Sequence, residues 1–276
     1  MTSQANRAKA FQSLHQEGCF ALPNPWDRGS ARILAGLGFK ALATTSAGFA
    51  RSTGVDDYRV TRDMVIAHAR ALCAATDLPV TADLENGFGD TPEDCAETIR
   101  MASEVGLVGG SIEDFSGEPG QQYDLAAATE RVAAAVEVAN ALPFPFIVTA
   151  RAENFFTGSP DLTDTIARLQ AYQDAGAHCL YAPGLRTLDD IKSLLSSVDR
   201  PVNVLLGPSA NRVPVSELAE IGVRRVSVGA VFNSLAYGAL IDAGEELLES
   251  GTFGFMERLP GEKLMRLMNA GSADED

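Results

Sequence analysis

Short apolar runs alternate with longer stretches of helical periodicity along most of the chain, and this alternation limits the possible folds. Several of the runs are apolar on both faces, which is typical of strands in a parallel sheet covered by helices. We predict eight strands, at residues 19–22, 41–45, 80–83, 110–113, 146–150, 179–182, 202–205 and 226–228. Helical stretches separate them, among them residues 61–76, 91–105, 125–141, 163–175 and 187–198.

The ends of the predicted helices carry recognisable start and stop residues. Thr91, Pro92 and Glu93 supply an N-cap, a proline at the first helical position and an acid in the first turn. The phrases LAGLGFKAL, ASEVGLVGG, YQDAGAHCL and LAEIGVRRVSVG each contain a helix end, a glycine cap and the start of a strand. Eight strand–helix units predict a (β/α)8 TIM-type barrel. A doubly wound open sheet is the alternative, which the lack of a GxGxxG motif after the first strand disfavours.

We expect a single barrel domain over residues 1–276, with an N-terminal helix at 4–17 and a C-terminal helical extension at 252–270. The extension follows a helix at 232–249 and lies outside the eight units. Its apolar residues are Phe253, Phe255, Met256, Leu259, Leu264, Leu267 and Met268. Because an extra apolar helix often packs on another subunit, we expect an oligomer, and packing on its own barrel is the alternative.

Composition excludes several classes of function. The net charge of −15 argues against nucleic-acid binding, which needs clustered lysine and arginine. No run of about 18 apolar residues predicts a transmembrane helix, and the polar N-terminal stretch has no signal-peptide core. We therefore expect a cytoplasmic protein that does not associate with membranes. Four scattered cysteines form no CxxC pair and are typical of buried thiols in a reducing compartment.

Acidic residues gather at the ends of two neighbouring strands, where the active sites of such barrels form. Asp83 and Glu85 are one residue apart after the third strand, and Glu113 ends the fourth strand. Close carboxylates repel one another unless a positive group lies between them. Oxygen-only ligation suits a hard divalent cation, so these three acids predict a Mg²⁺ site. Loop capping, or pairing with surface arginines, is the alternative.

Two further strand ends carry groups that bind anions. Arg151 ends the fifth strand, and its guanidinium can hold a substrate carboxylate with two hydrogen bonds. A salt bridge from Arg151 to Glu113 or Glu153 is the alternative. The turn after the second strand contains small residues whose backbone N–H groups can face an anion or an oxyanion. These residues are Thr45, Ser46 and Ala47.

Two other reaction types lack the residues that they need. None of the four lysines ends a predicted strand, which argues against a Schiff-base aldolase. The sequence has no GxSxG motif and no histidine at a strand end, which argues against a Ser–His–Asp hydrolase.

Five stretches together resemble the isocitrate lyase/phosphoenolpyruvate mutase superfamily: LPNPWDRGSARILAGLGFKALATTSAGFA, TADLENGFGD, GGSIEDFSG, VTARAENF and VRRVSVG. The resemblance covers roughly residues 8–245. It implies a (β/α)8 barrel that forms a homotetramer, a dimer of dimers, with the last helices exchanged between subunits. It also implies Mg²⁺ as cofactor, a small 2-oxo or 2-hydroxy acid as ligand, and the making or breaking of a C–C or C–P bond next to an enolate.

The resemblance assigns the metal site position by position. Asp83, Glu85 and Glu113 are similar to the Mg²⁺ shell of the superfamily, directly or through water. Asp57, in the stretch TGVDD, is similar to a further acid of the outer shell. Many members have aspartate where this chain has Glu85, and the longer side chain reaches farther toward a metal.

The resemblance also implies a substrate site. Arg151 resembles the arginine that binds the substrate carboxylate, and the turn of Thr45, Ser46 and Ala47 resembles the one that holds the carboxylate and oxo group. The catalytic residues implied are Arg151, Glu113 and Ser46. As a bond at C3 breaks, negative charge moves onto the 2-oxo oxygen, where the metal ion and Arg151 offset it.

The stretch after the fourth strand departs from the superfamily. Its lyases carry Lys-Lys-Cys-Gly-His there, with the cysteine as acid/base, and its mutase and phosphonopyruvate hydrolase members carry a gating loop with lysine and asparagine. Residues 114–123 contain no cysteine, lysine or histidine. The difference disfavours cleavage of isocitrate or methylisocitrate by that cysteine, and it disfavours phosphonate chemistry. Glu118, Gln121 and Tyr123 are the candidates for a substitute gate.

We therefore predict a Mg²⁺-dependent C–C lyase or hydrolase that acts through an enolate on a small 2-oxo or 2-hydroxy acid. Pyruvate, oxaloacetate, 2-oxoglutarate and a methylisocitrate-like acid are the candidate substrates. A 2-oxo-acid binding protein with little turnover is one alternative, and a phosphonopyruvate C–P mutase or hydrolase is the other.

Overall fold

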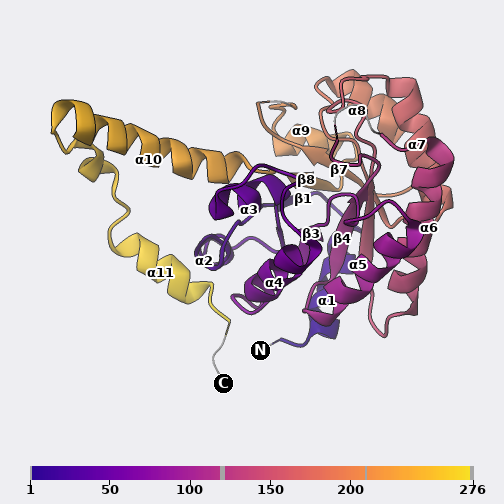
Figure 1. Ribbon diagram of the computed structural model, residues 1–276, viewed down its shortest axis with the longest axis horizontal. Helices are drawn as coiled ribbons and strands as arrows, with labels where there is room; N and C mark the ends of the chain where they lie inside the picture. Colours follow the sequence, from indigo (N-terminus) through magenta and orange to yellow (C-terminus); the bar gives the residue numbers. More distant parts are fainter. Residues whose placement is uncertain (1, 119–121, 209, 274–276) are drawn as a thin grey trace.

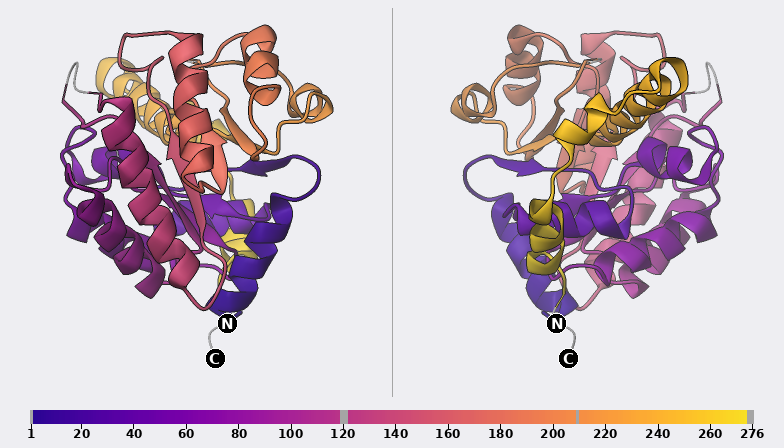
Figure 2. Two further views of the ribbon diagram at one scale, coloured as in Figure 1. Left: turned by 90° about the vertical axis from the view of Figure 1, so that its right-hand side faces the viewer. Right: turned by 90° about the vertical axis from the view of Figure 1, so that its left-hand side faces the viewer.

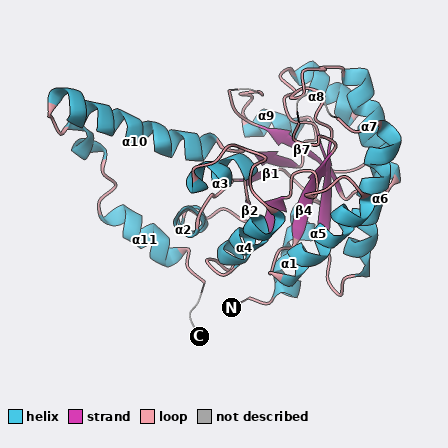
Figure 3. Ribbon diagram, viewed as in Figure 1, coloured by secondary structure: helices cyan, strands magenta, loops and turns pink. Residues whose placement is uncertain are grey.

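Eight parallel strands surround one axis and helices cover their outer side, so the predicted (β/α)8 barrel is confirmed (Figures 1 and 3). This computed structural model describes residues 2–118, 122–208 and 210–273. Hydrogen-bonded neighbours follow the order β1-β8-β7-β6-β5-β4-β3-β2. The strands are β1 (Phe20–Leu22), β2 (Leu42–Ala43), β3 (Val80–Asp83), β4 (Gly109–Glu113), β5 (Ile147–Arg151), β6 (Cys179–Tyr181), β7 (Val202–Leu205) and β8 (Arg225–Ser227). Each of them overlaps a predicted run.

Asn24 helps to close the barrel near β1 and β2, which stand at the two ends of the strand order. The backbone N–H of Ala43 on β2 donates to the Pro23 carbonyl oxygen, just after β1, at 3.0 Å. The side-chain oxygen of Asn24 accepts from the backbone N–H groups of Val228 at 3.1 Å and Gly229 at 2.9 Å. One side chain therefore ties the end of β1 to the end of β8, at the rim where barrel active sites form.

Helices follow the strands in the predicted rhythm, and α5 begins as its sequence predicts. Thr91 accepts from the Asp94 N–H at 3.2 Å, the Asp94 carboxylate accepts from the Thr91 N–H at 3.1 Å, and Pro92 takes the first helical position. The helices are α1 (Gln4–Leu14), α2 (Arg28–Gly36), α3 (Ser46–Thr53), α4 (Arg62–Cys73), α5 (Pro92–Glu104), α6 (Leu125–Ala141), α7 (Leu162–Asp174), α8 (Leu188–Leu195), α9 (Val215–Glu220), α10 (Val231–Ser250) and α11 (Glu262–Ala270). Within the described ranges, none of them combines the length and the apolarity that crossing a membrane requires.

The predicted C-terminal helical extension at 252–270 is divided into two short helical segments. A 3₁₀ turn, η1 (Gly254–Arg258), precedes Pro260, which lacks an N–H, and Gly261, whose φ of 55° suits glycine. α10 projects from the barrel, and the chain then returns through α11 toward α2 (Figures 1 and 2). A Cβ added at Gly36 of α2 would lie 2.1 Å from the Leu267 carbonyl oxygen, so α11 packs directly on α2 of its own chain.

The main apolar core lies between the strands and the helices, whereas polar residues line the inside of the barrel. Leu72 of α4, Ile99 of α5 and Leu169 of α7 are fully buried in the outer layer. The interior of a TIM barrel is usually filled by bulky branched side chains. Here the strand residues that line the inside include Thr81, Ser111, Thr149, Asn203 and Ser227. These small polar side chains leave room for a pocket that reaches into the barrel.

The helix α1 packs across the amino-terminal ends of the strands, where Phe11 is buried against Phe20. His15, just after α1, is buried as well, with Nδ1 2.8 Å from the Phe11 carbonyl oxygen and Nε2 3.3 Å from Arg225 Nη1. Because a guanidinium only donates, Nε2 accepts and Nδ1 carries the hydrogen. Burial and the positive charge of Arg225 together lower the pKa of His15 to about 3.

This neutral histidine makes the stability of the fold depend on pH. In the unfolded chain His15 binds a proton below its ordinary pKa of 6.5, whereas the folded chain resists protonation down to about pH 3. Stability is therefore fully present above pH 6.5 and falls as the pH drops through this window, by about 1.4 kcal/mol per pH unit.

We expect His15→Gln, whose amide can keep one donor and one acceptor, to remove this dependence. Between pH 5.5 and 4.5 the wild type should lose about 1.4 kcal/mol more unfolding free energy than the variant. Urea denaturation at both pH values measures the difference, and a series at pH 8 gives the intrinsic cost of the substitution. Parallel stability curves for the two proteins would contradict the assignment of a neutral His15.

Candidate active site

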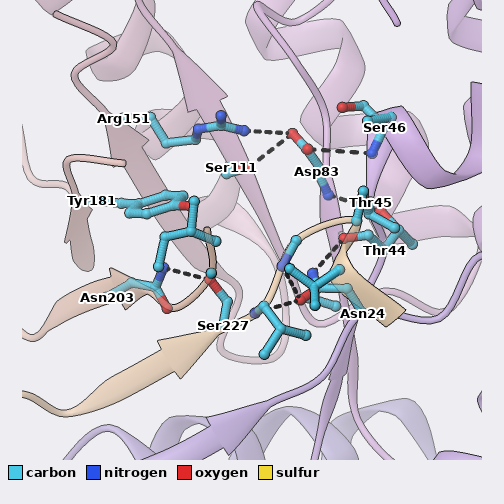
Figure 4. Close-up of a pocket in the computed structure, with 18 of the residues that line it drawn as sticks. Asn24, Thr44, Thr45, Ser46, Asp83, Ser111, Arg151, Tyr181, Asn203 and Ser227 are labelled. Carbon is cyan, nitrogen blue, oxygen red and sulfur yellow. Dashed lines mark hydrogen bonds and ion pairs between the residues drawn. The ribbon is translucent and has the colours of Figure 1, made fainter. Parts of the chain in front are cut away.

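A pocket of about 650 Å³ opens at the carboxyl ends of the strands, where the sequence predicted the site (Figure 4). Six of the predicted residues line it: Thr45, Ser46, Ala47, Asp57, Asp83 and Arg151. Glu113 lies behind the wall of this pocket in contact with Arg151. Glu85 lines a neighbouring pocket of about 460 Å³, and Tyr58 borders both pockets.

Arg151 is the positive group that lies among the clustered acids. Its Nη1 is 2.8 Å from Asp83 Oδ1, its Nη2 is 3.0 Å from Glu113 Oε2, and its Nε is 2.8 Å from Glu153 Oε1. The parallel register brings these groups together, because Glu113 on β4 pairs with Arg151 on β5, and Asp83 ends β3 alongside. The salt bridges to Glu113 and Glu153, weighed above as the alternative for Arg151, are therefore present.

The ion pairs leave part of the guanidinium free. Arginine has five N–H hydrogens in a planar fork, and these three contacts leave a second hydrogen on Nη1 and on Nη2. Arg151 is held rigidly by its acids and lines the pocket. It can therefore contact an anionic ligand while it stays paired.

Glu113 is fixed by a second partner besides Arg151. Only 2% of the residue is exposed, and Oε1 accepts a hydrogen bond from the Tyr58 hydroxyl at 2.6 Å. Burial raises the pKa of Glu113 well above its usual range, against the opposing effect of Arg151. Tyr58 was not among the predicted site residues, because it comes from the loop between α3 and α4, whose path the local sequence does not reveal.

Glu153 is held in place through Asp114. The Asp114 Oδ1 accepts from the Glu153 backbone N–H at 2.9 Å. Its Oδ2 accepts from Arg168 Nη1 at 3.1 Å and from the Tyr172 hydroxyl at 2.7 Å, both on α7. These contacts fix Asp114 in the barrel wall. The stretch 114–123 therefore begins with a residue that holds the site in position.

The predicted turn of small residues is the beginning of a helix, α3. The Thr45 hydroxyl caps it by accepting from the Gly48 N–H at 3.2 Å, and the Ser46 N–H points at Asp83 Oδ2 at 3.3 Å (Figure 4). A Cβ at Gly48 would lie 2.6 Å from Thr45 Cγ2, so this tight start requires glycine. A helix N-terminus attracts negative charge, so the backbone N–H groups at the start of α3 are suited to bind an anion.

Asp57 and Glu85 each present a buried oxygen that has no hydrogen-bond partner within the described part of the chain. These atoms are Asp57 Oδ1 and Glu85 Oε1. Burial, followed by the charges of Asp83 and Asp57, raises the pKa of Glu85 to about 8, and burial also raises the pKa of Asp57. Bare carboxylate oxygens beside Asp83 are the donor set that a hard divalent cation takes.

The donors fit a cation that keeps part of its water shell. Across residues 2–118, 122–208 and 210–273, no group of three or more His, Cys, Asp or Glu side chains forms a ready-made metal cage. Magnesium in proteins usually keeps several waters and takes only one or two carboxylates directly. The predicted metal residues are therefore compatible with such an ion, although Glu85 approaches from the neighbouring pocket.

The ends of the 114–123 stretch are anchored on both sides of the site. Glu118 lies 3.8 Å from Arg59, and the Phe115 ring packs edge-on against Tyr58. The Tyr123 hydroxyl accepts from the Asn86 side chain at 3.0 Å, and the Arg131 guanidinium lies 4.1 Å from the Tyr123 ring centre. Both the ring and the hydroxyl of Tyr123 are thus engaged. Gln121, the third candidate gate residue, lies outside the described residues.

The pocket also contains residues that sequence reasoning missed. They are Asn24, Tyr58, Tyr181, Asn203 and Arg225. Asn24 follows the first strand and Tyr181 ends the sixth, so strand-end position was a usable signal for both. Asn203 is a polar residue inside an otherwise apolar strand, a pattern that indicates an inward-facing functional side chain, and Arg225 is the first residue of β8.

A (β/α)8 barrel with an arginine–carboxylate cluster at the carboxyl ends of its strands has the architecture of a barrel enzyme. The family model described as phosphoenolpyruvate phosphomutase matches residues 11–248, so the chain belongs to this family. The resemblance to the isocitrate lyase/phosphoenolpyruvate mutase superfamily is thus confirmed. Its members are lyases and mutases, among them 2-methylisocitrate lyase and 2,3-dimethylmalate lyase.

Three similar proteins cover nearly the whole chain. A Burkholderia cenocepacia J2315 protein, assigned provisionally as a lyase or mutase, has a crystal structure that matches with a TM-score of 0.92 and 52% identity, with 95% of each chain covered. An uncharacterized protein of Mycobacterium tuberculosis is 35% identical over 250 residues, which cover 87% of this chain and 92% of that protein. The oxaloacetate decarboxylase of Pseudomonas entomophila is 26% identical over 248 residues, which cover 87% of this chain and 82% of that enzyme.

We expect Arg151→Met to destabilise the fold, because it removes the only guanidinium among Asp83, Glu113 and Glu153 within the described site. Buried carboxylates left without a counter-charge cost about 3–5 kcal/mol of unfolding free energy. Urea unfolding followed by circular dichroism at pH 7.5, without added metal, measures the loss. Arg100→Met, which breaks an exposed ion pair on α5, is the matched control and should leave the midpoint unchanged. If Arg151→Met also kept the wild-type midpoint, the cluster would not depend on this ion pair.

Proposed function

We propose that this protein is a Mg²⁺-dependent enzyme that acts on small 2-oxo or 2-hydroxy acids, as a C–C lyase or hydrolase working through an enolate. One observation carries the proposal: anion-binding groups line the main pocket, and cation-binding groups line it and the neighbouring pocket that Tyr58 also borders. Arg151 and the N-terminus of α3 supply the first kind, and the bare oxygens of Asp57 and Glu85 beside Asp83 supply the second. A 2-oxo acid needs both, since it is a small anion whose adjacent oxygens also chelate a cation.

In the proposed reaction, residues of this chain bind the substrate carboxylate and hold the binding groups in position. The free hydrogens of Arg151 hold the substrate carboxylate, and the backbone N–H of Ala47 at the start of α3 faces its oxygens, beside the Ser46 N–H that donates to Asp83. Glu113, itself tied to Tyr58, keeps the guanidinium from turning away. These donors are fixed before charge develops, so they offset negative charge on the enolate without reorganising.

Asp57, Asp83 and Glu85 are the residues that would hold the ion, directly or through water, and Glu113 lies behind them. A bound Mg²⁺ would supply Lewis-acid polarisation of the 2-oxo group. Relatives support the choice of substrate class, because one is named an oxaloacetate decarboxylase and another a 2,3-dimethylmalate lyase. The lack of cysteine, lysine and histidine in residues 114–123 favours such acids over isocitrate-type substrates.

The first expected result is exchange of the methyl protons of pyruvate in D₂O, because a site that stabilises an enolate lets C3 lose and regain protons. Proton NMR should show loss of the methyl signal with Mg²⁺ and none after EDTA treatment. Asp83→Ala and Glu113→Gln should each slow the exchange about 100-fold. Asp56→Asn is the matched control, because Asp56 is exposed beside Asp57 and lies outside the pocket.

The same series of measurements separates the alternatives. Saturable binding of pyruvate, oxaloacetate and 2-oxoglutarate without exchange or cleavage would make the protein a binder of 2-oxo acids. Competition by phosphonoformate at low concentration, together with phosphate release from phosphonopyruvate, would favour C–P chemistry. If Asp83→Ala left the Mg²⁺ affinity unchanged in a calorimetric titration, the metal assignment would be wrong.

We also propose that the chain assembles as a homotetramer, a dimer of dimers whose neighbouring subunits cover α10. This helix projects from the barrel in Figures 1 and 2. It also carries large apolar side chains that are exposed to solvent. The exposed apolar residues on α10 and the turns after it include Leu235, Leu240, Ile241, Leu248, Phe253 and Leu259. Several exposed large apolar side chains on one projecting element favour association.

Light scattering coupled to gel filtration should give a mass near four times the 29.2 kDa of the chain. Leu240→Glu combined with Leu248→Glu should lower that mass, because each substitution places a charge in the covered surface. Glu249→Lys, which changes charge at an exposed polar position of the same helix, is the control. A wild-type protein of 29.2 kDa in solution would refute the tetramer.

A further inference from the structure

A buried arginine without an acidic partner lies at the base of the pocket. Arg225 is the first residue of β8, lines the pocket and is only 4% exposed. Its Nε donates to Asn203 Oδ1 at 2.9 Å, its Nη2 donates to Thr149 Oγ1 at 3.1 Å, and its Nη1 lies 3.3 Å from Nε2 of the neutral His15. All three partners are uncharged. Within the described part of the chain, this guanidinium therefore has hydrogen bonds but no ion pair.

The contact with Thr149 shows how far into the barrel the guanidinium of Arg225 lies. Thr149 comes two residues before Arg151 on β5, and alternate residues of a strand face the same side. Two residues of a parallel strand span about 7 Å. The Arg225 guanidinium therefore lies inside the barrel, at the level of the inward-facing residue below Arg151.

The acids of the pocket lie at its other end. Among the described residues, the carboxylates that line it are those of Asp57, Asp83 and Glu153. Asp83 ends β3, Glu153 follows β5, and Asp57 lies in the loop between α3 and α4. Asp83 and Glu153 pair with Arg151 at the rim. The positive charge at the base of the pocket is not paired with any of these acids.

The base of the pocket also has hydrogen-bond donors left for a small anion. A guanidinium has five N–H hydrogens, and the three contacts of Arg225 leave one hydrogen on Nη1 and one on Nη2. The small side chains of Ala43, Thr81 and Ser111 line the same pocket. A buried charge without a counter-charge is costly, so an anion that enters this space is stabilised. A carboxylate suits the site, because its two oxygens can meet two N–H groups.

We propose that Arg225 is a second anion-binding group, which binds one carboxylate of the substrate at the base of the pocket while Arg151 binds the other at the rim. The substrate is then a short 2-oxo dicarboxylate, in preference to pyruvate. This inference rests on the proposed function and narrows its substrate class. The step of about 7 Å along β5 is a length that a four- or five-carbon diacid can span with a hydrogen bond at each end.

A matched pair of ligands tests the second carboxylate. In 2-oxopentanoate a methyl group replaces the far carboxylate of 2-oxoglutarate, and the two acids are otherwise the same. Calorimetric titration of the wild type with Mg²⁺ should show 2-oxoglutarate binding about 10- to 100-fold more tightly, the usual effect of a hydrogen bond to a charged group. Oxaloacetate and 2-oxobutanoate form a second pair with a shorter chain. Equal affinities within both pairs would overturn the inference.

Asn203→Asp tests whether Arg225 is the group responsible. Asn203 Oδ1 already accepts from Arg225 Nε, so aspartate would supply an internal counter-charge with almost no change of shape. The Ser227 hydroxyl, which now accepts from the Asn203 amide nitrogen, can then donate to the second carboxylate oxygen (Figure 4). We expect the preference for 2-oxoglutarate to disappear, mostly through weaker binding of that acid. Asn140→Asp, the same exchange at an exposed position of α6, is the matched control and should keep the preference.

Two arginine variants complete the assignment. Arg225→Gln removes the charge itself and should also abolish the preference. If this variant fails to fold, Asn203→Asp decides alone, because its urea midpoint should be no lower than that of the wild type. Arg51→Gln should keep the preference, although Arg51 also lines the pocket and its Nη1 donates to Ser234 Oγ at 3.0 Å. A preference that persists in Asn203→Asp, or that depends on Arg51 instead, would overturn the inference.

A wild type that binds none of these acids would instead refute the proposed function. Succinate then decides the inference, because it has two carboxylates and no 2-oxo group to chelate Mg²⁺. Wild-type binding of succinate that Asn203→Asp weakens about tenfold or more would support the second anion-binding group. Undetectable binding of succinate, or equal binding by the two proteins, would overturn it.

Discussion

The guanidinium of Arg151, held among three carboxylates, is the contact on which the rest of the site depends. It joins Asp83 of β3 and Glu113 of β4 to its own strand, and it also pairs with Glu153. Without it, the acids would repel one another in a buried space. With it, the carboxylates are held in place at the rim of the barrel. The guanidinium of Arg151 still has two N–H hydrogens that can face a ligand in the pocket. Further elements hold each acid: Tyr58 binds Glu113, and Asp114 fixes the backbone at Glu153.

Such a site is possible because the apolar core lies outside the strands. Leucine, isoleucine and alanine side chains fill the layer between the barrel and its helices, so the axis need not be packed with aliphatic groups. Threonine, serine and asparagine occupy the inside instead, and Arg225 and His15 satisfy one another at the closed end. The same arrangement that hollows the barrel for a ligand also carries hydrogen-bonded side chains from His15 after α1 to Ser227 of β8.

The sequence was a good guide wherever a residue follows a strand. Parallel strands place their carboxyl ends on one rim, so Asp83, Glu113 and Arg151 could be brought together from strand order alone. Strand order could not reveal that Arg151 itself neutralises the acids, because that depends on the side-chain conformations of Arg151 and of the acids around it. It also could not show that Glu85, with a φ of 48°, turns into the neighbouring pocket. The predicted small-residue turn at Thr45 is the start of α3, where the Ser46 N–H donates to Asp83.

The sequence by itself determined the alternation of strands and helices, and through it the barrel, the rim and the family. Those features follow from periodicity and end signals that act over a few residues. Only the tertiary structure decided which polar groups meet: Tyr58 with Glu113, Arg168 with Asp114, and Arg225 with Asn203. These partners are separated by 22 to 55 residues along the chain. Their pairing is set by the need of each buried polar group for a partner in a shared space.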